Sequence, residues 1–137
     1  TKIPIFGWYL KKIGSIAIDR NKITKENIGF LENIKKSILD NRPLVIFPQG
    51  TRVFPNERPN FKKGVYRIYN ELKIKCLPVT INSGEVWPKK GNLIKNKKII
   101  ISILKPIETG FENEEFINSL QMSMYDSLDK ASNLSSA

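Results

Sequence analysis

The strongest indication of the fold is the stretch Leu44-Val45-Ile46-Phe47-Pro48-Gln49-Gly50-Thr51-Arg52. Its first four residues are uniformly apolar, which is typical of a strand buried on both faces. Pro48 cannot continue a hydrogen-bonded ladder and Gly50 permits unusual dihedral angles, so the strand should end in a turn with exposed backbone N–H groups. Arg52 adds a planar guanidinium suited to a phosphate. The stretch predicts an anion-binding strand end, where open α/β sheets bind their ligands; a surface turn with a solvated arginine is the alternative.

Apolar periodicity in the rest of the chain predicts alternating helices and strands. Helices are expected over residues 4–13, 24–41, 64–73 and 113–131, and strands over residues 15–18, 44–47, 76–81 and 97–104. This alternation predicts an α/β fold, with a mostly parallel or mixed sheet flanked by helices and right-handed crossovers. The length and the absence of a repeat or linker predict a single domain over residues 1–137.

Three segments resemble the sequence blocks of the glycerolipid acyltransferases, the lysophosphatidic acid acyltransferase family, in the family's order. Residues 14–20 resemble the second block, with Ala17 in place of Phe. Residues 47–52 resemble the third block, Phe-Pro-Glu-Gly-Thr-Arg, with Gln49 in place of Glu. Residues 77–84 resemble the fourth block, an apolar-Pro-Val strand that ends in Ser-Gly. Further likeness lies in residues 3–8 and 61–64, so the resemblance covers residues 1–85.

This resemblance implies an enzyme of phospholipid biosynthesis with a glycerolipid acyltransferase-like fold. The implied reaction passes an acyl chain from an acyl thioester, either acyl-CoA or acyl carrier protein, to 1-acyl-glycerol 3-phosphate and gives phosphatidic acid. The thioesters are substrates, so no cofactor is expected, and the mechanism requires no metal. The resemblance also implies a bacterial protein that is membrane-associated, at the cytoplasmic face of the inner membrane.

The substrate phosphate needs cations and hydrogen-bond donors. Arg52 is the first candidate for its cation, and Arg20 is the second. Backbone N–H groups near Gly50 and the hydroxyl of Thr51 are expected to add hydrogen bonds.

Three further residues are candidates for substrate binding. Gln49 keeps the shape of the family's Glu without its charge, so we expect it to orient the turn or a substrate hydroxyl rather than to transfer protons. Asp19 is a candidate for which a structural ion pair with Arg20 is the favoured alternative. Lys62 is a candidate cation, with a solvated surface position as the alternative.

The chain contains no histidine. The family's first block is a His and an Asp separated by four residues, in which the His is the general base for the acceptor hydroxyl. No other side chain has an unperturbed pKa that suits this role near neutral pH. We therefore expect the catalytic pair to precede Thr1, so that residues 1–137 form an acyltransferase domain truncated at its N-terminus and inactive alone. A natural non-catalytic relative that binds anionic lipids is the alternative.

The charge of the chain is strongly asymmetric. Its net charge is +10, and all but one of its 23 Lys and Arg side chains precede residue 106. Such a basic body suits an anionic membrane surface, a phosphorylated substrate or an acidic carrier protein; the lysine content of a protein from an AT-rich genome is the alternative. A nucleic-acid-binding domain is a less favoured reading, because the aromatic residues fall at predicted core positions. No apolar run is long enough to predict a transmembrane helix.

Overall fold

The computed structural model describes residues 8–9, 12–14 and 26–135. The chain divides into two compact units, Thr1–Val45 and Ile46–Ala137. In the first unit, helix α2 spans Glu26–Leu39. It ends as predicted before Pro43, because Asn41 takes a left-handed conformation with φ of 55°.

Other predictions for the first unit are tested only in part. The predicted helix over residues 4–13 is described at a few positions, where the N–H of Ile13 donates to the carbonyl of Tyr9 at 3.0 Å, as in a helix. The strand predicted over residues 15–18 lies outside the described residues.

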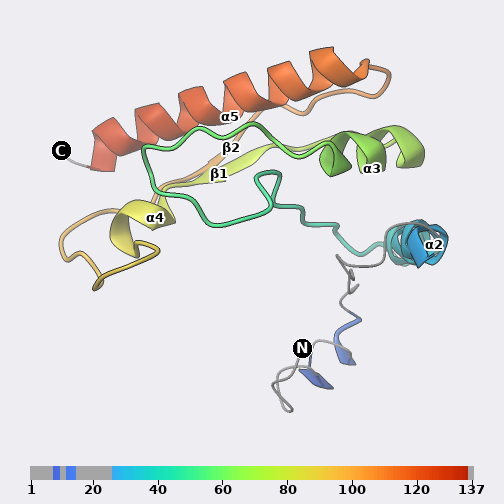
Figure 1. Ribbon diagram of the computed structural model, residues 1–137, viewed down its shortest axis with the longest axis horizontal. Helices are drawn as coiled ribbons and strands as arrows, with labels where there is room; N and C mark the ends of the chain where they lie inside the picture. Colours follow the sequence, from blue (N-terminus) through green and yellow to red (C-terminus); the bar gives the residue numbers. More distant parts are fainter. Residues whose placement is uncertain (1–7, 10–11, 15–25, 136–137) are drawn as a thin grey trace. The chain divides into compact units, whose positions relative to one another are not determined.

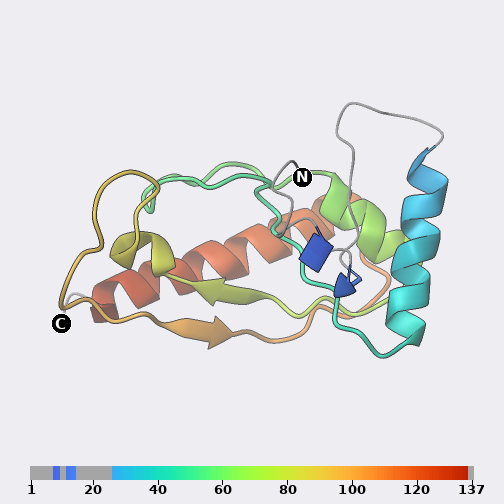
Figure 2. The ribbon, with the colours of Figure 1, turned by 90° about the horizontal axis from the view of Figure 1, so that it is seen from below.

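The second unit contains three helices and two strands in its described part (Figure 1). In chain order these are α3 (Gly64–Leu72), β1 (Val79–Ile81), α4 (Ser83–Val86), β2 (Ile101–Ile103) and α5 (Asn113–Ser135). The two strands are antiparallel, with Val79 opposite Ile103 and Ile81 opposite Ile101. Figure 2 shows them side by side along α5, with their arrows in opposite directions.

The α/β character is confirmed, but the predicted parallel arrangement is not found in the described part of the chain. Its sheet has two strands, and they are antiparallel because residues 82–100 reverse the chain direction between β1 and β2.

The prediction of a buried strand over residues 44–47 is wrong for this structure. Val45 and Phe47 are 72% and 79% exposed, and no strand of the described residues pairs with this segment. The alternate residue Ile46 is the one that packs against the core.

The helices agree more closely with the sequence predictions. Helix α3 was expected over residues 64–73 and ends at Leu72, after which Lys73 is left-handed with φ of 50°. Helix α4, a single turn of four residues, was not predicted from the sequence. Helix α5 extends beyond the predicted end at residue 131 and continues to Ser135. Its last turn is tied to α4, because the hydroxyl of Ser135 donates to the carboxylate of Glu85 at 2.8 Å.

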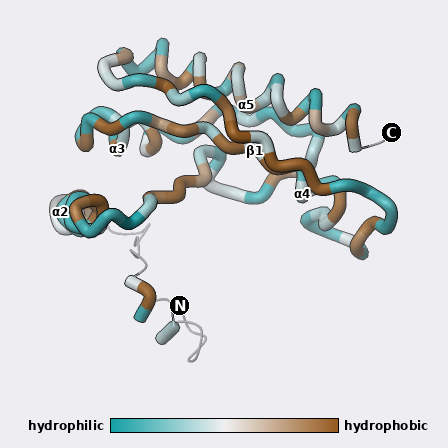
Figure 3. Tube along the Cα trace, turned by 180° about the vertical axis from the view of Figure 1, so that it is seen from behind, coloured by the Kyte–Doolittle hydropathy of each residue, from teal (hydrophilic) through white to brown (hydrophobic). Residues whose placement is uncertain are grey.

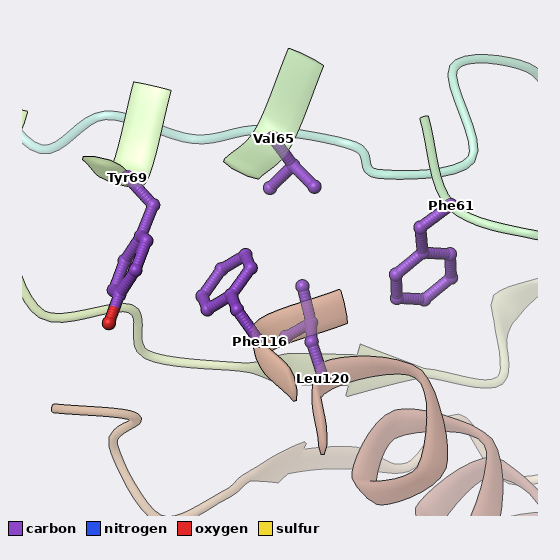
Figure 4. Close-up of a cluster of buried hydrophobic side chains, with 5 residues drawn as sticks. All are labelled: Phe61, Val65, Tyr69, Phe116 and Leu120. Atoms are coloured by element: carbon purple, nitrogen blue, oxygen red, sulfur yellow. The ribbon is translucent and has the colours of Figure 1, made fainter. Parts of the chain in front are cut away.

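The core of the second unit joins α3, α5 and the segment before α3. It consists of Phe61, Val65, Tyr69, Phe116 and Leu120 (Figure 4). Phe116 is fully buried, and its ring stacks on that of Tyr69 with 4.0 Å between the centroids. The inward apolar positions thus come from both helices, Val65 and Tyr69 from α3 and Phe116 and Leu120 from α5.

Helix α5 covers one face of the strand pair. Thr80 of β1 is buried against it, and its hydroxyl lies 2.8 Å from that of Ser127. The alternate strand residues are exposed, and Figure 3 shows the chain at β1 in the brown of hydrophobic residues. Their exposed fractions range from 44% to 72% for Val79, Ile81, Ile101 and Ile103.

Candidate functional site

Residues 47–52, which we call the Phe47–Arg52 turn, form a tight turn at the start of a long loop. The N–H of Gly50 donates to the carbonyl of Phe47 at 3.0 Å and closes the turn. Pro48 lies at the second position, where its fixed φ is favourable, and Gly50 has a φ of 70° that suits glycine. The predicted turn is confirmed, although it follows an extended segment rather than a strand.

The first half of the turn is fixed by its neighbours. The N–H of Lys62 donates to the carbonyl of Pro48 at 2.8 Å. Gln49 is half-buried, and its side chain lies near enough to the Tyr125 phenol of α5 to influence its pKa. A Cβ atom built on Gly50 would lie 3.3 Å from Cγ of Lys62, so the stem of this lysine runs beside the turn. The structure thus brings together Gln49, Gly50 and Lys62 of the predicted site.

The second half of the turn faces solvent. Gly50, Thr51 and Arg52 are all exposed. Within residues 26–135 and the two short described segments before them, no hydrogen bond or ion pair uses the Arg52 guanidinium, the Thr51 hydroxyl or the backbone N–H of either residue. Unpaired N–H groups next to a guanidinium are suited to an anion. The arrangement is therefore chemically capable of binding a phosphate without first breaking internal bonds.

Arg58, the other arginine of this loop, differs from Arg52 because its guanidinium has several partners. It forms an ion pair with Asp129, donates to the carbonyl of Glu57 at 3.0 Å and lies over the ring of Tyr125 at 5.3 Å. These contacts of its guanidinium attach the loop to α5. Arg52 is thus the arginine of this loop that remains available for a ligand.

Two predicted site residues, Asp19 and Arg20, lie outside the described residues. Their roles remain predictions from the sequence resemblance.

Sequence reasoning missed the part of α5 that holds the loop. Three of its side chains contact consecutive parts of the loop, and we call them the α5 polar row: Gln121, Tyr125 and Asp129. Gln121 accepts a hydrogen bond from the N–H of Phe61 at 2.5 Å, and the Tyr125 hydroxyl donates to the carbonyl of Pro59 at 2.5 Å. The spacing of four residues, which places polar side chains on one helix face, was the available signal. The sequence alone does not show which of the preceding residues they contact.

The environment of Tyr125 is partly apolar. Burial raises the pKa of its phenol, while hydrogen bonding with Gln49 and the charge of Arg58 act in the opposite direction. The hydroxyl is therefore a neutral hydrogen-bond donor over the physiological range, which suits its contact with the Pro59 carbonyl.

Comparison with known proteins gives a consistent result. The family model described as Acyltransferase matches residues 1–82. Over 115 residues, the chain is 36% identical to the 1-acyl-sn-glycerol-3-phosphate acyltransferase of Saccharomyces cerevisiae, covering 78% of this chain and 36% of that protein. Over 125 residues, it is 32% identical to the protein of the same name from Helicobacter pylori, covering 90% of this chain and 52% of the relative.

The chain thus spans between about a third and a half of the length of these two relatives. No solved structure gives a significant match.

Proposed function

Since the chain belongs to the acyltransferase family, we propose that the full-length gene product transfers an acyl chain to 1-acyl-glycerol 3-phosphate and forms phosphatidic acid. The acyl donor is an acyl thioester, either acyl-CoA or acyl carrier protein. The hydroxyl of the acceptor attacks the thioester carbonyl, the carbon–sulfur bond breaks, and the thiol leaves with the proton. The names of the similar yeast and bacterial proteins support this acceptor.

One observation carries the assignment of the phosphate site. The Phe47–Arg52 turn presents to solvent a guanidinium and backbone N–H groups that have no partner among the described residues, while its first half is fixed. In this proposal, Arg52 binds the acceptor phosphate through its planar fork, and the N–H groups and hydroxyl near Thr51 add hydrogen bonds. Lys62, whose stem runs beside Gly50, adds positive charge. Because the chain contains no histidine, the general base is not assigned to any of its residues.

Acyl transfer by the full-length gene product tests the proposal directly. The purified protein is incubated with lysophosphatidic acid and either acyl-CoA or acyl carrier protein, and phosphatidic acid is measured. Monoacylglycerol, which lacks the phosphate, is the matched acceptor control. Formation of phosphatidic acid with strong preference for the phosphorylated acceptor supports the proposal. Binding of lysophosphatidic acid without turnover would instead identify a non-catalytic lipid-binding relative.

Substitution of Gln49 by Glu tests whether this residue takes part in proton transfer. The Gln49→Glu variant is expected to keep at least about a tenth of the wild-type kcat/KM, because the shape of the side chain is preserved and at most one neutral hydrogen bond is altered. Steady-state kinetics with lysophosphatidic acid give the comparison. If turnover vanished while circular dichroism showed an intact fold, the orienting role proposed for Gln49 would be wrong.

We further propose that the protein acts at the cytoplasmic face of a membrane, where its lipid substrate resides. Trp8 is 61% exposed, and the ammonium of Lys12 lies 4.8 Å from the centre of its ring, a combination suited to the interface of an anionic bilayer. Residues 86–107 contain six lysines and no acidic residue. Flotation with anionic vesicles is expected to carry the protein at low salt and to fail with neutral vesicles. Equal flotation with both would contradict the electrostatic part of this proposal.

None of the helices in the described part of the chain is both long and apolar enough to cross a bilayer.

The strand pair is proposed to belong to a larger, mixed sheet in the full-length gene product. Two strands are fewer than an open sheet usually needs for stability, and one face of the pair exposes four aliphatic side chains. Slow hydrogen exchange at the amides of β1 and β2 in the full-length protein would support this arrangement, and rapid exchange would contradict it.

A further inference from the structure

We infer that Tyr125 is a positioning residue for substrate binding: together with Gln121 and Asp129 it fixes the segment that carries the Phe47–Arg52 turn, and thereby the location of Arg52. This inference rests on the proposed role of the turn in binding the acceptor phosphate. It adds a part of the site that lies more than 60 residues away along the chain.

The α5 polar row binds the loop at three successive points. Asp129 pairs with Arg58, the Tyr125 hydroxyl donates to the carbonyl of Pro59, and Gln121 accepts from the N–H of Phe61. Two of these three contacts are to the backbone of the loop, so they fix the path of the chain and not only the position of a side chain. The three side chains are four residues apart on one face of α5, so the spacing of the helix determines where the loop residues they contact are held.

The contacts continue from this segment into the turn. Lys62 follows Phe61 directly, and its N–H donates to the carbonyl of Pro48 at 2.8 Å. Tyr125 also lies near the turn itself, since the side chain of Gln49 influences the pKa of its hydroxyl. The same tyrosine is therefore hydrogen-bonded to the loop at residue 59 and lies near the turn at residue 49, two positions that are ten residues apart in the sequence.

Packing restricts the ring of Tyr125 and so the location of its hydroxyl. The ring meets that of Phe61 edge to face, with 5.3 Å between the centroids, and the guanidinium of Arg58 lies 5.3 Å from its centre. Phe61 belongs to the core cluster. The hydroxyl is thus held by a ring that the rigid core positions.

Arg52 makes no hydrogen bond or ion pair within the described part of the chain. Its position therefore depends on contacts made by neighbouring residues. Its backbone is located by the preceding residues of the turn. A displacement of about 1 Å at a binding group can lower a rate by about 100-fold, even when the altered residue does not touch the substrate. The hydroxyl of Tyr125 is therefore expected to influence binding of the phosphate without contacting it.

The test compares two tyrosine variants of the full-length gene product. Tyr125→Phe removes the hydroxyl and keeps the ring, and it is expected to raise KM for lysophosphatidic acid about 5- to 10-fold, with KM for the acyl donor unchanged. Tyr66→Phe is the matched control, since Tyr66 packs against the same core and no hydrogen bond of its hydroxyl is found among the described residues. It is expected to leave both KM values unchanged. A purely structural role of Tyr125 would lower the melting temperature and move neither KM.

A second pair of variants examines the row at a different residue. Gln121→Met removes the acceptor of the Phe61 N–H at nearly constant volume and is expected to raise KM for lysophosphatidic acid, whereas Gln121→Glu retains an acceptor and should restore most of the affinity.

In addition, Tyr125→Phe should have little further effect in an Arg52→Ala background, because both changes act on the same contact. Full additivity of these two changes would overturn the inference.

Failure of the proposed function is distinguished by measuring binding of glycerol 3-phosphate by calorimetry in the same proteins. If the wild type shows no acyl transfer but binds this ligand, a 5- to 10-fold weaker affinity of Tyr125→Phe would support the positioning role alone. Acyl transfer with KM and affinity unchanged in Tyr125→Phe would overturn the inference and leave the proposed function standing. Absence of both transfer and binding in the wild type would overturn both.

Discussion

The Arg52→Ala variant of the full-length gene product is expected to lose about 30- to 1,000-fold in kcat/KM for lysophosphatidic acid, which corresponds to about 2–4 kcal/mol. The guanidinium is exposed and has no hydrogen-bond or ion-pair partner among the described residues, so its removal should leave the fold intact. A bound phosphate would exclude water from the guanidinium. A hydrogen bond between charged groups is stronger than one between neutral groups. Steady-state kinetics at fixed donor concentration measure the loss.

The specificity of this effect is shown by two comparisons. Arg52→Lys should restore only part of the activity, because an ammonium supplies charge without the planar fork of donors. Arg67→Ala removes the same charge from the exposed face of α3 and should remain close to wild type. An Arg52→Ala enzyme with wild-type kinetics for the phosphorylated acceptor, or an equal loss in Arg67→Ala, would show that Arg52 does not bind the phosphate.

The Phe116→Ala variant is expected to lower the free energy of unfolding by about 3–5 kcal/mol. Phe116 is fully buried and stacks on Tyr69, so truncation leaves a cavity between α3 and α5. A loss of this size is a large part of the stability of a typical domain. Urea denaturation of the full-length gene product, followed by circular dichroism, gives the midpoint and the free energy.

A matched substitution on the same helix provides the control. Met122 of α5 is 67% exposed, and Met122→Ala is expected to change the stability by no more than about 0.5 kcal/mol. If Phe116→Ala does not fold at all, Phe116→Leu removes less volume and should give a smaller, measurable loss. Equal stabilities of the Phe116 variants and the Met122 variant would contradict the core assignment.

The helices could be predicted from the sequence because their signals are local. Apolar spacing located α2, α3 and α5, and the left-handed residues Asn41 and Lys73 end two of them near the predicted positions. Strand pairing is different, since it depends on which segments meet. The apolar run before Pro48 has the composition of a buried strand, yet Val45 and Phe47 are exposed. Alternation of elements along the chain therefore indicated an α/β fold without determining the direction of its strands.

At the candidate site, too, some features can be predicted from neighbouring residues, while others depend on residues far away in the sequence. Pro48 and Gly50 identify a tight turn by their chemistry alone, and the structure has such a turn. Nothing local distinguishes Arg52 from Arg58, which is six residues later and pairs with Asp129. Which of two neighbouring arginines remains available to a ligand is determined by a helix far along the sequence.

The connection between the loop and α5 also determines when the site can form during protein synthesis. The contacts at Phe61, Pro59 and Arg58 join residues separated by 60, 66 and 71 positions. The Phe47–Arg52 turn therefore leaves the ribosome well before the helix that locates it, and contacts of such sequence separation form slowly. A nascent chain that stops before α5 carries the residues of the turn without their support. The proposed phosphate site is accordingly complete only after α5 has been synthesised, and Lys130 is the single basic residue of that helix.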